Sequence, residues 1–545
     1  MPAKRVLITS ALLYANGKLH FGHIAGAYLS ADIYARFERM QGTEVLFLSG
    51  SDEYGVAITL SAEKAGRSPS AHVEHFHRLN QRLFEQIGIS FDCYSRTTLP
   101  HHRVPVYQYF EELSANGYVE KMRTQQLYSE AEGRFLADRY VTGICPLCRH
   151  EGARGDECPA CGGSYEATDL INPTSKVGGS PLVLRETDHW FLRLDKLATP
   201  LRDFLAKKSW KPGVLNFASH YLDDLRPRAI TRDGEWGVPV PDGDGKVFYV
   251  WFEACIGYLS AAQDWAERQG EPEAWKRFWC QSDTKLVQFI GKDNIFFHAL
   301  FFPAMTMGQD KPYKLVDDLP ANDFLTLEGR QFSKSEGWYV DLEEFLTRYS
   351  ADQLRYTLAA NAPETSDSEF TWSDFQLRCN SELLGKFGNF ANRTLVFAQK
   401  HCKAEVPRLI GDEFLQKVAE KVREIEQAYA TYSPRRACAL LMEIATLGNV
   451  YFDNCKPWQM EPASRDNVIA ACLNCLKTLA IVSAPIIPET AAKLWAMLGF
   501  RGAIKWEALS TQLQAGTPLP PPQLLFKKIE DEQIAEEMAK LRAGK

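Results

Sequence analysis

The sequence predicts an α/β fold, with a domain built on a parallel sheet, followed by an all-α helical bundle. Apolar runs alternate with amphipathic helical segments over residues 1–115, which is typical of successive βαβ units. An apolar run at 286–290 ends in a polar turn and leads into a helical stretch at 295–305, so we expect the sheet to continue there. After residue 335, helical periodicity and capping signals replace the alternation.

The bulk properties are those of a globular enzyme. A chain of 545 residues is too long for a single core, so roughly three or four domains are expected. No run approaches the ~20 apolar residues of a membrane span, and the first residues lead into a strand with no signal-peptide core. We therefore expect a cytoplasmic protein with no membrane partner. The net charge of −7 gives no global basic field for nucleic acid, although local basic patches would suffice for a large RNA.

Two histidines lie where the first strand gives way to the first helix. Residues 6–8 predict a short buried strand, and the apolar residues of 24–40 fit one face of a helix. His20 and His23 lie at the N-terminus of that helix, where unpaired N–H groups and a partial positive charge favour phosphate. Gly22 would let a ligand approach the backbone closely. Taken alone, the pattern is equally consistent with two surface histidines.

The alternation continues with a predicted strand at 45–48 and a helix at 71–87. No G-x-G-x-x-G follows the first strand and no G-x-x-x-x-G-K-[ST] occurs, so a nucleotide would be held without a dinucleotide fingerprint or a P-loop. From about 116 to 229, turn-rich segments indicate an insertion into the sheet domain. Sheet-like runs resume at 248–251 and 286–290. Ligands bind at the carboxyl ends of strands in open α/β sheets. The turn that carries His20 and His23 and the polar turn after 286–290 are therefore expected to face one crevice.

The cysteines indicate a metal site inside the insertion. Two Cys-x-x-Cys pairs, nine residues apart, supply four thiolates for a closed tetrahedral zinc: Cys145, Cys148, Cys158 and Cys161. The alternatives are two disulfides or metal-free thiols. A closed four-cysteine site would organise the insertion rather than catalyse. A further pair, Cys472 and Cys475, lies in an apolar helical stretch and is predicted to be core.

A glycine-bounded loop at 329–337 carries Lys334 between Ser333 and Ser335. A lysine point charge flanked by hydroxyls suits phosphate oxygens. By itself this pattern is more often a solvated surface loop.

Helical signals dominate the remaining chain. Capping boxes at Ser350/Gln353 and Ser373/Gln376 predict two helix starts. Long helical stretches are predicted at 373–403, at 412–432, from Pro434 to about 453, and at 465–484; together they make a bundle. Residues 518–522 form a Pro-rich linker, and 529–543 a charged terminal helix.

The histidine motif near the start and Phe-Ser-Lys-Ser far downstream, with an insertion between them, resemble the two signatures of class I aminoacyl-tRNA synthetases. In detail the chain resembles the methionyl-tRNA synthetase family. The similar blocks occur in order and cover essentially the whole chain: 11–17, 50–55, 249–251, 254–258, 289–293, 297–298, the zinc knuckle, Asn389 with Arg393, and 457–458. The resemblance implies a Rossmann-type catalytic domain (1–115 and 230–325) interrupted by a zinc-bearing connective insertion (116–229). A linking region with the QFSKS loop (326–380) and an all-α anticodon-binding domain with a C-terminal helix (381–545) follow.

The resemblance also implies the activity and its residues. The expected reaction is ATP-dependent activation of methionine, with transfer to initiator and elongator tRNA(Met). The implied catalytic residues are His20, His23 and Lys334. The implied methionine-binding residues are Ala11, Leu12, Tyr14, Asp52, Trp251, Ala254, Tyr258 and His298, and Tyr14 or His298 is expected to donate a hydrogen bond to sulfur. The implied ATP-binding residues are Tyr14, His20, Gly22, His23, Gly291, Asp293, Ser333, Lys334 and Ser335, with Mg²⁺ sharing the phosphate charge. The implied anticodon-binding residues are Asn389, Arg393 and Trp458.

Several positions depart from the family pattern. Leu13 and Cys255 stand where proline is usual, and Gln331-Phe332 replaces the usual Lys-Met, which removes one positive charge from the downstream loop. Gly385 stands where some relatives carry an asparagine that contacts the anticodon. None is expected to abolish activity, and the absence of an appended β-barrel module favours a monomer.

Three alternatives remain at this stage: a synthetase for another apolar amino acid, a non-catalytic tRNA-binding relative, and a small-molecule nucleotidyltransferase. For the first, 116–229 is too short to hold an editing insertion. The second would not need His20, His23, Asp52 and Lys334. The third leaves the helical bundle unexplained.

Overall fold

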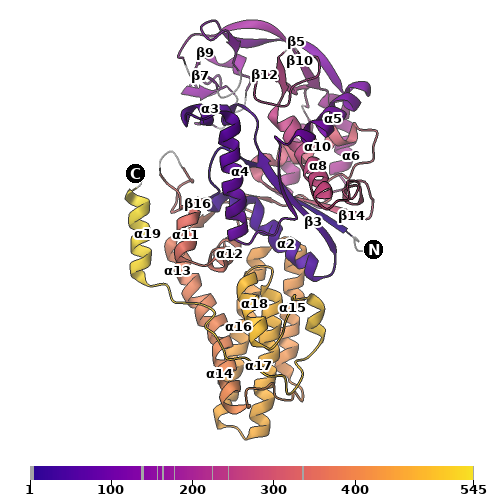
Figure 1. The fold of residues 1–545 in the computed structure, drawn as a ribbon. Coiled ribbons are helices and arrows are strands. Elements are labelled where there is room, and N and C mark those ends of the chain that lie inside the picture. Colours follow the sequence, from indigo (N-terminus) through magenta and orange to yellow (C-terminus); the bar gives the residue numbers. More distant parts are fainter. Residues whose placement is uncertain are drawn as a thin grey trace.

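The computed structural model describes residues 5–543 except 137–139, 156–157, 162–164, 177, 224, 244 and 334–336. The parallel sheet, its covering helices and a β-rich layer form one end of the molecule, and an elongated helical bundle forms the other (Figure 1). The two ends meet where α2 (Leu29–Met40) and α12 (Ala351–Ala360) pack against three helices of the bundle: α15 (Glu413–Ala430), α16 (Pro434–Cys455) and α18 (Pro488–Met497).

A six-stranded parallel sheet is the centre of the first part. The strand order is β15-β14-β1-β3-β2, and β4 also pairs with β3. Strand β1 (Arg5–Ser10) lies between β14 (Thr284–Gly291) and β3 (Glu44–Asp52), and helices cover both faces, so its central residues are buried. The remaining strands are β2 (Leu13–Tyr14), β4 (Cys93–Arg96) and β15 (Ala321–Asn322). The strands predicted at 6–8, 45–48 and 286–290 are confirmed.

The helix predicted at 24–40 forms as one continuous run with a π-helical segment inside it. It comprises α1 (Phe21–His23), the π-helical residues Ile24–Tyr28, and α2 (Leu29–Met40). The helix predicted at 71–87 is α4 (Pro69–Gln86), whose N-cap Ser68 Oγ accepts from the Ala71 N–H at 3.2 Å. Two more helices flank this part of the sheet: α3 (Val56–Lys64) and α5 (Arg103–Ala115).

The insertion contains more strand than its turn-rich sequence predicts. A long antiparallel pair, β5 (Val119–Ser129) and β10 (Val183–Leu192), forms its frame, with β6 (Arg134–Phe135) and β11 (Arg228–Ala229) at the edges. A separate sheet places β7 (Val141–Ile144) between β8 (Glu151–Arg154) and β9 (Ile171–Ser175). Helices α6 (Ala198–Leu205) and α7 (Pro212–Leu222) follow.

The prediction of sheet at 248–251 is largely wrong. Strand β13 (Lys246–Phe248) pairs with β12 (Thr231–Asp233) in a two-stranded sheet of its own, and α8 (Val250–Arg268) begins two residues later. A short apolar run has no period that separates a buried strand from the first turn of a buried helix. After α9 (Lys276–Trp279) and β14, the helix predicted at 295–305 forms as the π-helical residues Phe297–Phe301 and α10 (Phe302–Met307).

Short elements connect the sheet to the bundle: β16 (Leu325–Leu327), α11 (Leu342–Arg348), α12 (Ala351–Ala360), β17 (Ser368–Phe370) and α13 (Trp372–Leu377). The capping box at Ser350 and Gln353 is confirmed, with both reciprocal bonds present. The one predicted at Ser373 is wrong. Thr371 Oγ1 caps the helix instead, accepting from the Asp374 N–H at 3.1 Å, which places the buried Trp372 at the first helical position.

The bundle contains the π-helical residues Arg378–Gly388, then α14 (Asn389–His401), α15 (Glu413–Ala430), α16 (Pro434–Cys455), α17 (Pro462–Ser483) and α18 (Pro488–Met497). By length and composition α17 could cross a membrane, but 83% of its apolar window is buried inside the protein, as in the core helix of a bundle. Its cysteines, Cys472 and Cys475, are fully buried and unbridged, which confirms the core prediction.

The terminal helix α19 (Asp531–Ala543) returns from the bundle and lies beside α11 and α13 (Figure 1). Arg348 of α11 forms ion pairs with Glu536 and Glu537, and Gln376 Nε2 donates to Asp531 Oδ1 at 2.7 Å. The predicted terminal helix is confirmed, and it packs beside α11 and α13, which connect the sheet to the bundle.

Candidate active site

A cavity of about 1310 Å³ lies where the sheet changes direction. From β1 the chain crosses to β3 on one side, while β14 and β15 extend the sheet on the other. Ala11, just past the end of β1, donates its N–H to Phe289 O at 3.0 Å, so the two strand ends are joined at the floor of the crevice. Such a switch point is the usual ligand site of an open α/β sheet.

The cavity brings together most of the residues that the sequence singles out. All the residues implied to bind methionine line it: Ala11, Leu12, Tyr14, Asp52, Trp251, Ala254, Tyr258 and His298. So do His20, Gly22, His23, Gly291 and Asp293. Ser333 does not line it, and it pairs through its backbone with Trp338. Lys334 and Ser335 lie outside the described residues.

His20 and His23 form a stacked pair at the start of α1. Their ring centroids are 3.6 Å apart, the His20 N–H donates to His23 Nδ1 at 3.3 Å, and the His23 N–H donates to His20 O at 3.0 Å. Phe332 of the downstream loop stacks on the other side of His20, with centroids 4.9 Å apart. A Cβ on Gly22 would lie 3.1 Å from the His20 ring and 3.2 Å from Phe332, so glycine permits this close packing.

A second glycine shapes the β14 side of the cavity. A Cβ on Gly291 would lie 2.6 Å from Asp293 Oδ1, so the turn after β14 brings that carboxylate back over the strand end. Burial raises the pKa of Asp293. The turns after β1 and β14 thus contribute imidazoles and a carboxylate to one crevice.

Asp52 ends β3 beside Tyr14, its partner in the β2–β3 register. It is 3% exposed, and its Oδ1 has no hydrogen-bond partner among the described residues. Burial raises the pKa of Asp52, a charge on Glu253 would raise it further, and the Tyr54 N–H acts in the opposite direction. A buried carboxylate that lines a cavity and has an oxygen without a hydrogen bond is suited to bind a cation.

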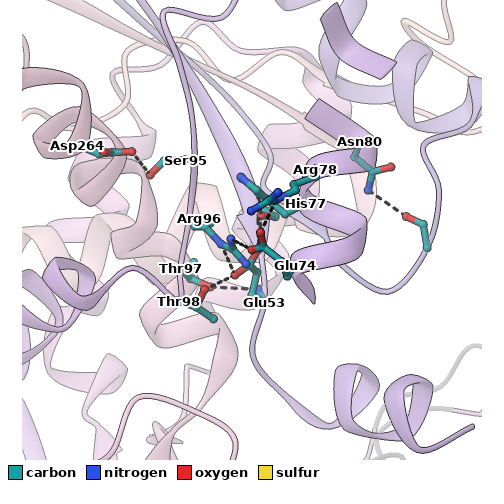
Figure 2. A network of polar contacts seen from close by, with 12 residues as sticks. Glu53, Glu74, His77, Arg78, Asn80, Ser95, Arg96, Thr97, Thr98 and Asp264 are labelled. Atoms are coloured by element: carbon teal, nitrogen blue, oxygen red, sulfur yellow. Dashed lines mark hydrogen bonds and ion pairs between the residues drawn. The ribbon is translucent and has the colours of Figure 1, made fainter. Parts of the chain in front are cut away.

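The next residue, Glu53, lies in a polar network with Arg96, Thr97 and Thr98 (Figure 2). Its carboxylate accepts from Arg96 Nε at 2.8 Å, from Ser51 Oγ at 2.7 Å and from Thr98, while its N–H donates to Thr97 Oγ1 at 3.1 Å. This network fixes the end of β3 and so the direction in which Asp52 points. Sequence reasoning missed it, because Arg96, Thr97 and Thr98 lie more than 40 residues from Glu53 in the chain.

Tyr258 and His298 form a buried hydrogen-bonded pair at the cavity wall. Tyr258 Oη lies 2.8 Å from His298 Nε2, and His298 Nδ1 lies 3.0 Å from Asn294 O. Burial lowers the pKa of His298 to about 4, so the ring is neutral; Nδ1–H donates to the carbonyl and Nε2 accepts from the tyrosine. The expectation that His298 donates to sulfur is therefore wrong for this arrangement, because its single N–H is already used. Tyr14 remains the expected donor.

Aromatic and apolar side chains complete the wall. Trp251 stacks on Phe297 with centroids 4.0 Å apart and planes 7° apart, which fixes the indole from behind. A Cβ on Gly257 would lie 2.8 Å from Leu12 Cδ1, so α8 approaches the floor closely. Both departures from the family's prolines, Leu13 and Cys255, are buried and line the cavity.

The segment after the downstream loop is tied to the loop before His20. Lys18 Nζ lies 2.7 Å from Asp341 Oδ2 and 3.2 Å from Glu343 Oε2, and Arg82 pairs with Glu343 at 2.9 Å. Asp341 is also the N-cap of α11. The two signature loops therefore share one ionic anchor, which spacing alone did not reveal.

The four clustered cysteines are arranged as metal ligands. Their sulfur atoms all lie within 4.8 Å of one another, with Cys145 to Cys161 at 3.9 Å and Cys148 to Cys158 at 3.6 Å. A tetrahedral site with Zn–S bonds of about 2.3 Å has S–S edges of about 3.8 Å, whereas a disulfide needs about 2.05 Å. Backbone N–H groups of Leu147 and Ala160 donate to Cys145 Sγ and Cys158 Sγ at 3.4 Å, as suits thiolates. The group fits a metal and does not fit two disulfides.

A second cluster lies on the bundle. Asn389 and Arg393 of α14 contact α16 through Asn449 (3.1 Å) and Asp453 (2.5 Å). Arg393 also lies over the ring of Phe452, 4.2 Å from its centroid, and Trp458 packs near the same ring with 52% of its surface exposed. The predicted face is thus assembled, and Asn449 and Phe452 are members that spacing missed.

The cavity also contains residues that the sequence did not single out. Arg232, Trp236, Tyr249 and Phe332 line it, and Trp236 Nε1 donates to Glu53 O at 2.7 Å. Phe332 was noted as a departure, but its stacking partner was not predicted. Arg232 lies in β12, Trp236 in the turn that follows it and Tyr249 at the N-cap of α8, and no chemical spacing in the sequence assigned them a role.

Comparisons with known proteins agree with this geometry. A family model described as tRNA synthetases class I (M) matches residues 6–395, and a model of the anticodon binding domain of methionyl tRNA ligase matches 409–545. A methionine–tRNA ligase of Protochlamydia amoebophila is 54% identical over 99% of this chain and 80% of its own, and one of Chlamydia abortus is 54% identical over 91% and 92%. The structure of Mycobacterium tuberculosis methionyl-tRNA synthetase in complex with methionyl-adenylate superposes with a TM-score of 0.81 at 25% identity, covering 96% of this chain and all of that one. The chain therefore belongs to the methionyl-tRNA synthetase family of class I aminoacyl-tRNA synthetases.

Proposed function

We propose that this enzyme joins methionine to tRNA(Met), initiator and elongator, by forming methionyl-adenylate from methionine and ATP and then transferring the methionyl group to the tRNA 3′ end. The observation that carries the proposal is the cavity at the switch point of the sheet. The residues implied to bind methionine line it together with His20, His23 and Asp293, which are implied to bind ATP. One strand-to-helix turn, from Ala11 to His23, contributes to both sides, so two substrates bound there would meet.

For methionine, Asp52 binds the α-ammonium through its carboxylate, which has no cation partner among the described residues. Trp251 and Tyr258 enclose the side chain, since a polarizable thioether packs well against aromatic rings. Tyr14 donates a hydrogen bond to the sulfur, while His298 orients Tyr258. A pocket that discriminates by shape separates substrates that differ by one methylene by about 1–3 kcal/mol, so close analogues should be activated weakly.

For ATP, the N-terminus of α1 with His20, Gly22 and His23 faces the phosphates, and Gly291 and Asp293 face the nucleoside. The substrate carboxylate oxygen attacks the α-phosphorus, the α–β phosphoanhydride bond breaks, and pyrophosphate leaves. His20, His23 and the loop residues Ser333, Lys334 and Ser335 stabilise charge that develops on phosphate oxygens. Bound Mg²⁺ would neutralise part of that charge.

Outside the cavity, Cys145, Cys148, Cys158 and Cys161 hold one structural zinc, because closed thiolate sites favour that ion. Asn389, Arg393 and Trp458 bind the anticodon, with the exposed indole stacking on an unpaired base.

The remaining parts of the proposal concern organisation. The catalytic domain comprises 1–115 and 230–325, the insertion 116–229, the linking region 326–380 and the anticodon-binding domain 381–545. We propose that the enzyme works in the cytoplasm as a monomer without a membrane partner.

The test is methionine-dependent ATP–pyrophosphate exchange, run with each of the twenty amino acids separately, followed by charging of tRNA(Met). Exchange with methionine and charging of both tRNA(Met) species are expected. Exchange with another apolar amino acid instead of methionine would show that the enzyme activates that amino acid. Exchange with none of the twenty, from folded protein, would refute the proposal in favour of a tRNA-binding relative.

A further inference from the structure

Behind Asp52 lies a buried chain of three polar side chains that the proposed reaction does not use. Glu253 Oε2 lies 2.9 Å from His102 Nε2, and His102 Nδ1 lies 2.5 Å from Ser260 Oγ. Ser260 in turn lies within hydrogen-bond distance of Ile256 O, at 3.2 Å. Glu253 and His102 are completely buried and Ser260 is 2% exposed, so the chain is sealed from solvent.

We propose that Glu253 is a neutral carboxylic acid, kept protonated by this chain so that Asp52 is the one carboxylate that presents negative charge to the substrate's ammonium group. The inference rests on the proposed function in its assignment of Asp52. It makes Glu253 a positioning residue, which acts on methionine through Asp52.

The protons can be placed along the chain in one direction. Ser260 Oγ–H donates to Ile256 O, which leaves the Ser260 oxygen to accept from His102 Nδ1–H. A neutral imidazole then has Nε2 as an acceptor, so the proton between His102 and Glu253 belongs to the acid. Burial supports the same state, since it raises the pKa of Glu253 and lowers that of His102 to about 3.

Buried acids that do not line the cavity show what an ionised carboxylate has inside this protein, whereas Asp52 lines the cavity and would meet its cation in the substrate's ammonium group. Glu53 contacts Arg96 (Figure 2), Asp264 contacts Arg268 at 2.7 Å, and Asp32 contacts Arg355 at 2.6 Å. Glu253 has no arginine or lysine partner among the described residues, and its Oε1 has no hydrogen bond there. The desolvation cost of an unpaired buried charge exceeds the stabilisation that a carboxylate gains in the first turn of a helix, where Glu253 lies in α8.

The titratable groups that face Glu253 favour the neutral form as well. They are Asp52, Glu53 and Tyr54 at the end of β3, Cys255 on α8 and His102 before α5, with Arg103 bonded to Tyr54. Three adjacent carboxylates, of which Glu53 is already paired to Arg96, cannot all ionise cheaply. A neutral Glu253 removes the repulsion that would otherwise suppress the charge of Asp52.

The first experiment is infrared spectroscopy of the intact enzyme at neutral pH. We expect a carboxylic-acid C=O band that shifts when the protein is labelled with ¹³C-glutamate and that disappears in E253Q. The matched control is D264N on the same helix, because Asp264 is paired to an arginine and should contribute no such band. Absence of a glutamate acid band in the labelled parent overturns the proposal, and this readout does not require any variant to fold.

The second experiment is the KM for methionine in ATP–pyrophosphate exchange. The amide of E253Q can donate to His102 Nε2 as the acid does, so its KM should stay within about threefold of the parent with kcat little changed. A rise of about tenfold or more in a folded E253Q would mean that a negative charge had been removed, and would overturn the proposal. If the parent itself does not exchange with methionine, the proposed function fails, while the infrared result still stands on its own.

Discussion

Arg355 and Asp32 form a completely buried ion pair at the joint between the sheet and the bundle. Arg355 Nη2 of α12 lies 2.6 Å from Asp32 Oδ2 of α2, and its remaining donors reach four carbonyl oxygens: Ile87, Gly88, Pro485 and Ile486. One guanidinium therefore joins the helix that follows the histidine motif to the loop between α17 and α18. The anchor couples the end that we propose to activate methionine with the end that we propose to bind the anticodon.

Removing this guanidinium should destabilise the whole chain. Arg355→Met leaves Asp32 with Arg36 as its remaining cation and unpairs several buried carbonyls, so we expect a loss of about 3–5 kcal/mol in the free energy of unfolding. Urea unfolding measures it, with Arg436→Met, at a surface ion pair of the bundle, as a control that should change little. A loss no larger than the control's would contradict the structural role of Arg355.

Stability should fall on mild acidification. Burial lowers the pKa of His77 and of His298 to about 4 and that of His102 to about 3, whereas the unfolded chain binds these protons near pH 6.5. The contribution of these neutral histidines to the free energy of unfolding is therefore fully present above about pH 6.5. It is lost as the pH falls toward 4, at up to about 1.4 kcal/mol per pH unit for each histidine. Urea midpoints between pH 7.5 and 5 measure it. His298→Gln should flatten the slope relative to the parent, and the same slope in both proteins would refute the neutral assignment of His298.

Purified protein should contain one zinc per chain. Cys148→Ser should lower the zinc content and open the insertion to proteolysis, because it removes one of four ligands. Cys472→Ala, inside the bundle, is the matched control and should keep the metal. Metal-free parent protein with four freely titratable thiols would contradict the site.

Replacing Trp458 should reduce tRNA charging without affecting methionine activation. Its indole is half-exposed and does not line the cavity, so Trp458→Ala should reduce tRNA charging by about 10- to 100-fold, the value of one stacked base, and leave ATP–pyrophosphate exchange near normal. Ile410→Ala, an exposed apolar residue elsewhere in the bundle, should change neither activity. Loss of both activities in Trp458→Ala would indicate a folding defect instead.

The elements with strong local signals were predicted well. The central strands, the helix after His23, the Ser350 capping box and the helix beginning at Pro434 all follow from period, caps and proline placement within a few residues. Prediction failed where the signal was short: residues 248–251 are apolar with no period, and Ser373 competes with Thr371 for the same cap. The β5–β10 pair was missed because its polar, half-exposed strands lack a continuous apolar run.

By itself, the sequence determined the order of the elements and the four thiolates, because each depends on spacing within a motif or on which end of a strand a turn follows. Its resemblance to the family indicated most of the predicted residues that meet in the cavity. Only the tertiary structure decided the partners that set their chemistry. Glu253 meets His102 across 151 residues, while Lys18 meets Asp341 and Arg355 meets Asp32 across 323. Periodicity tells which face of an element is buried, but not which buried group opposes it. The charge of a carboxylate depends on that neighbour, so the distinction between a paired Glu53 and an unpaired Glu253 exists only in the packed protein.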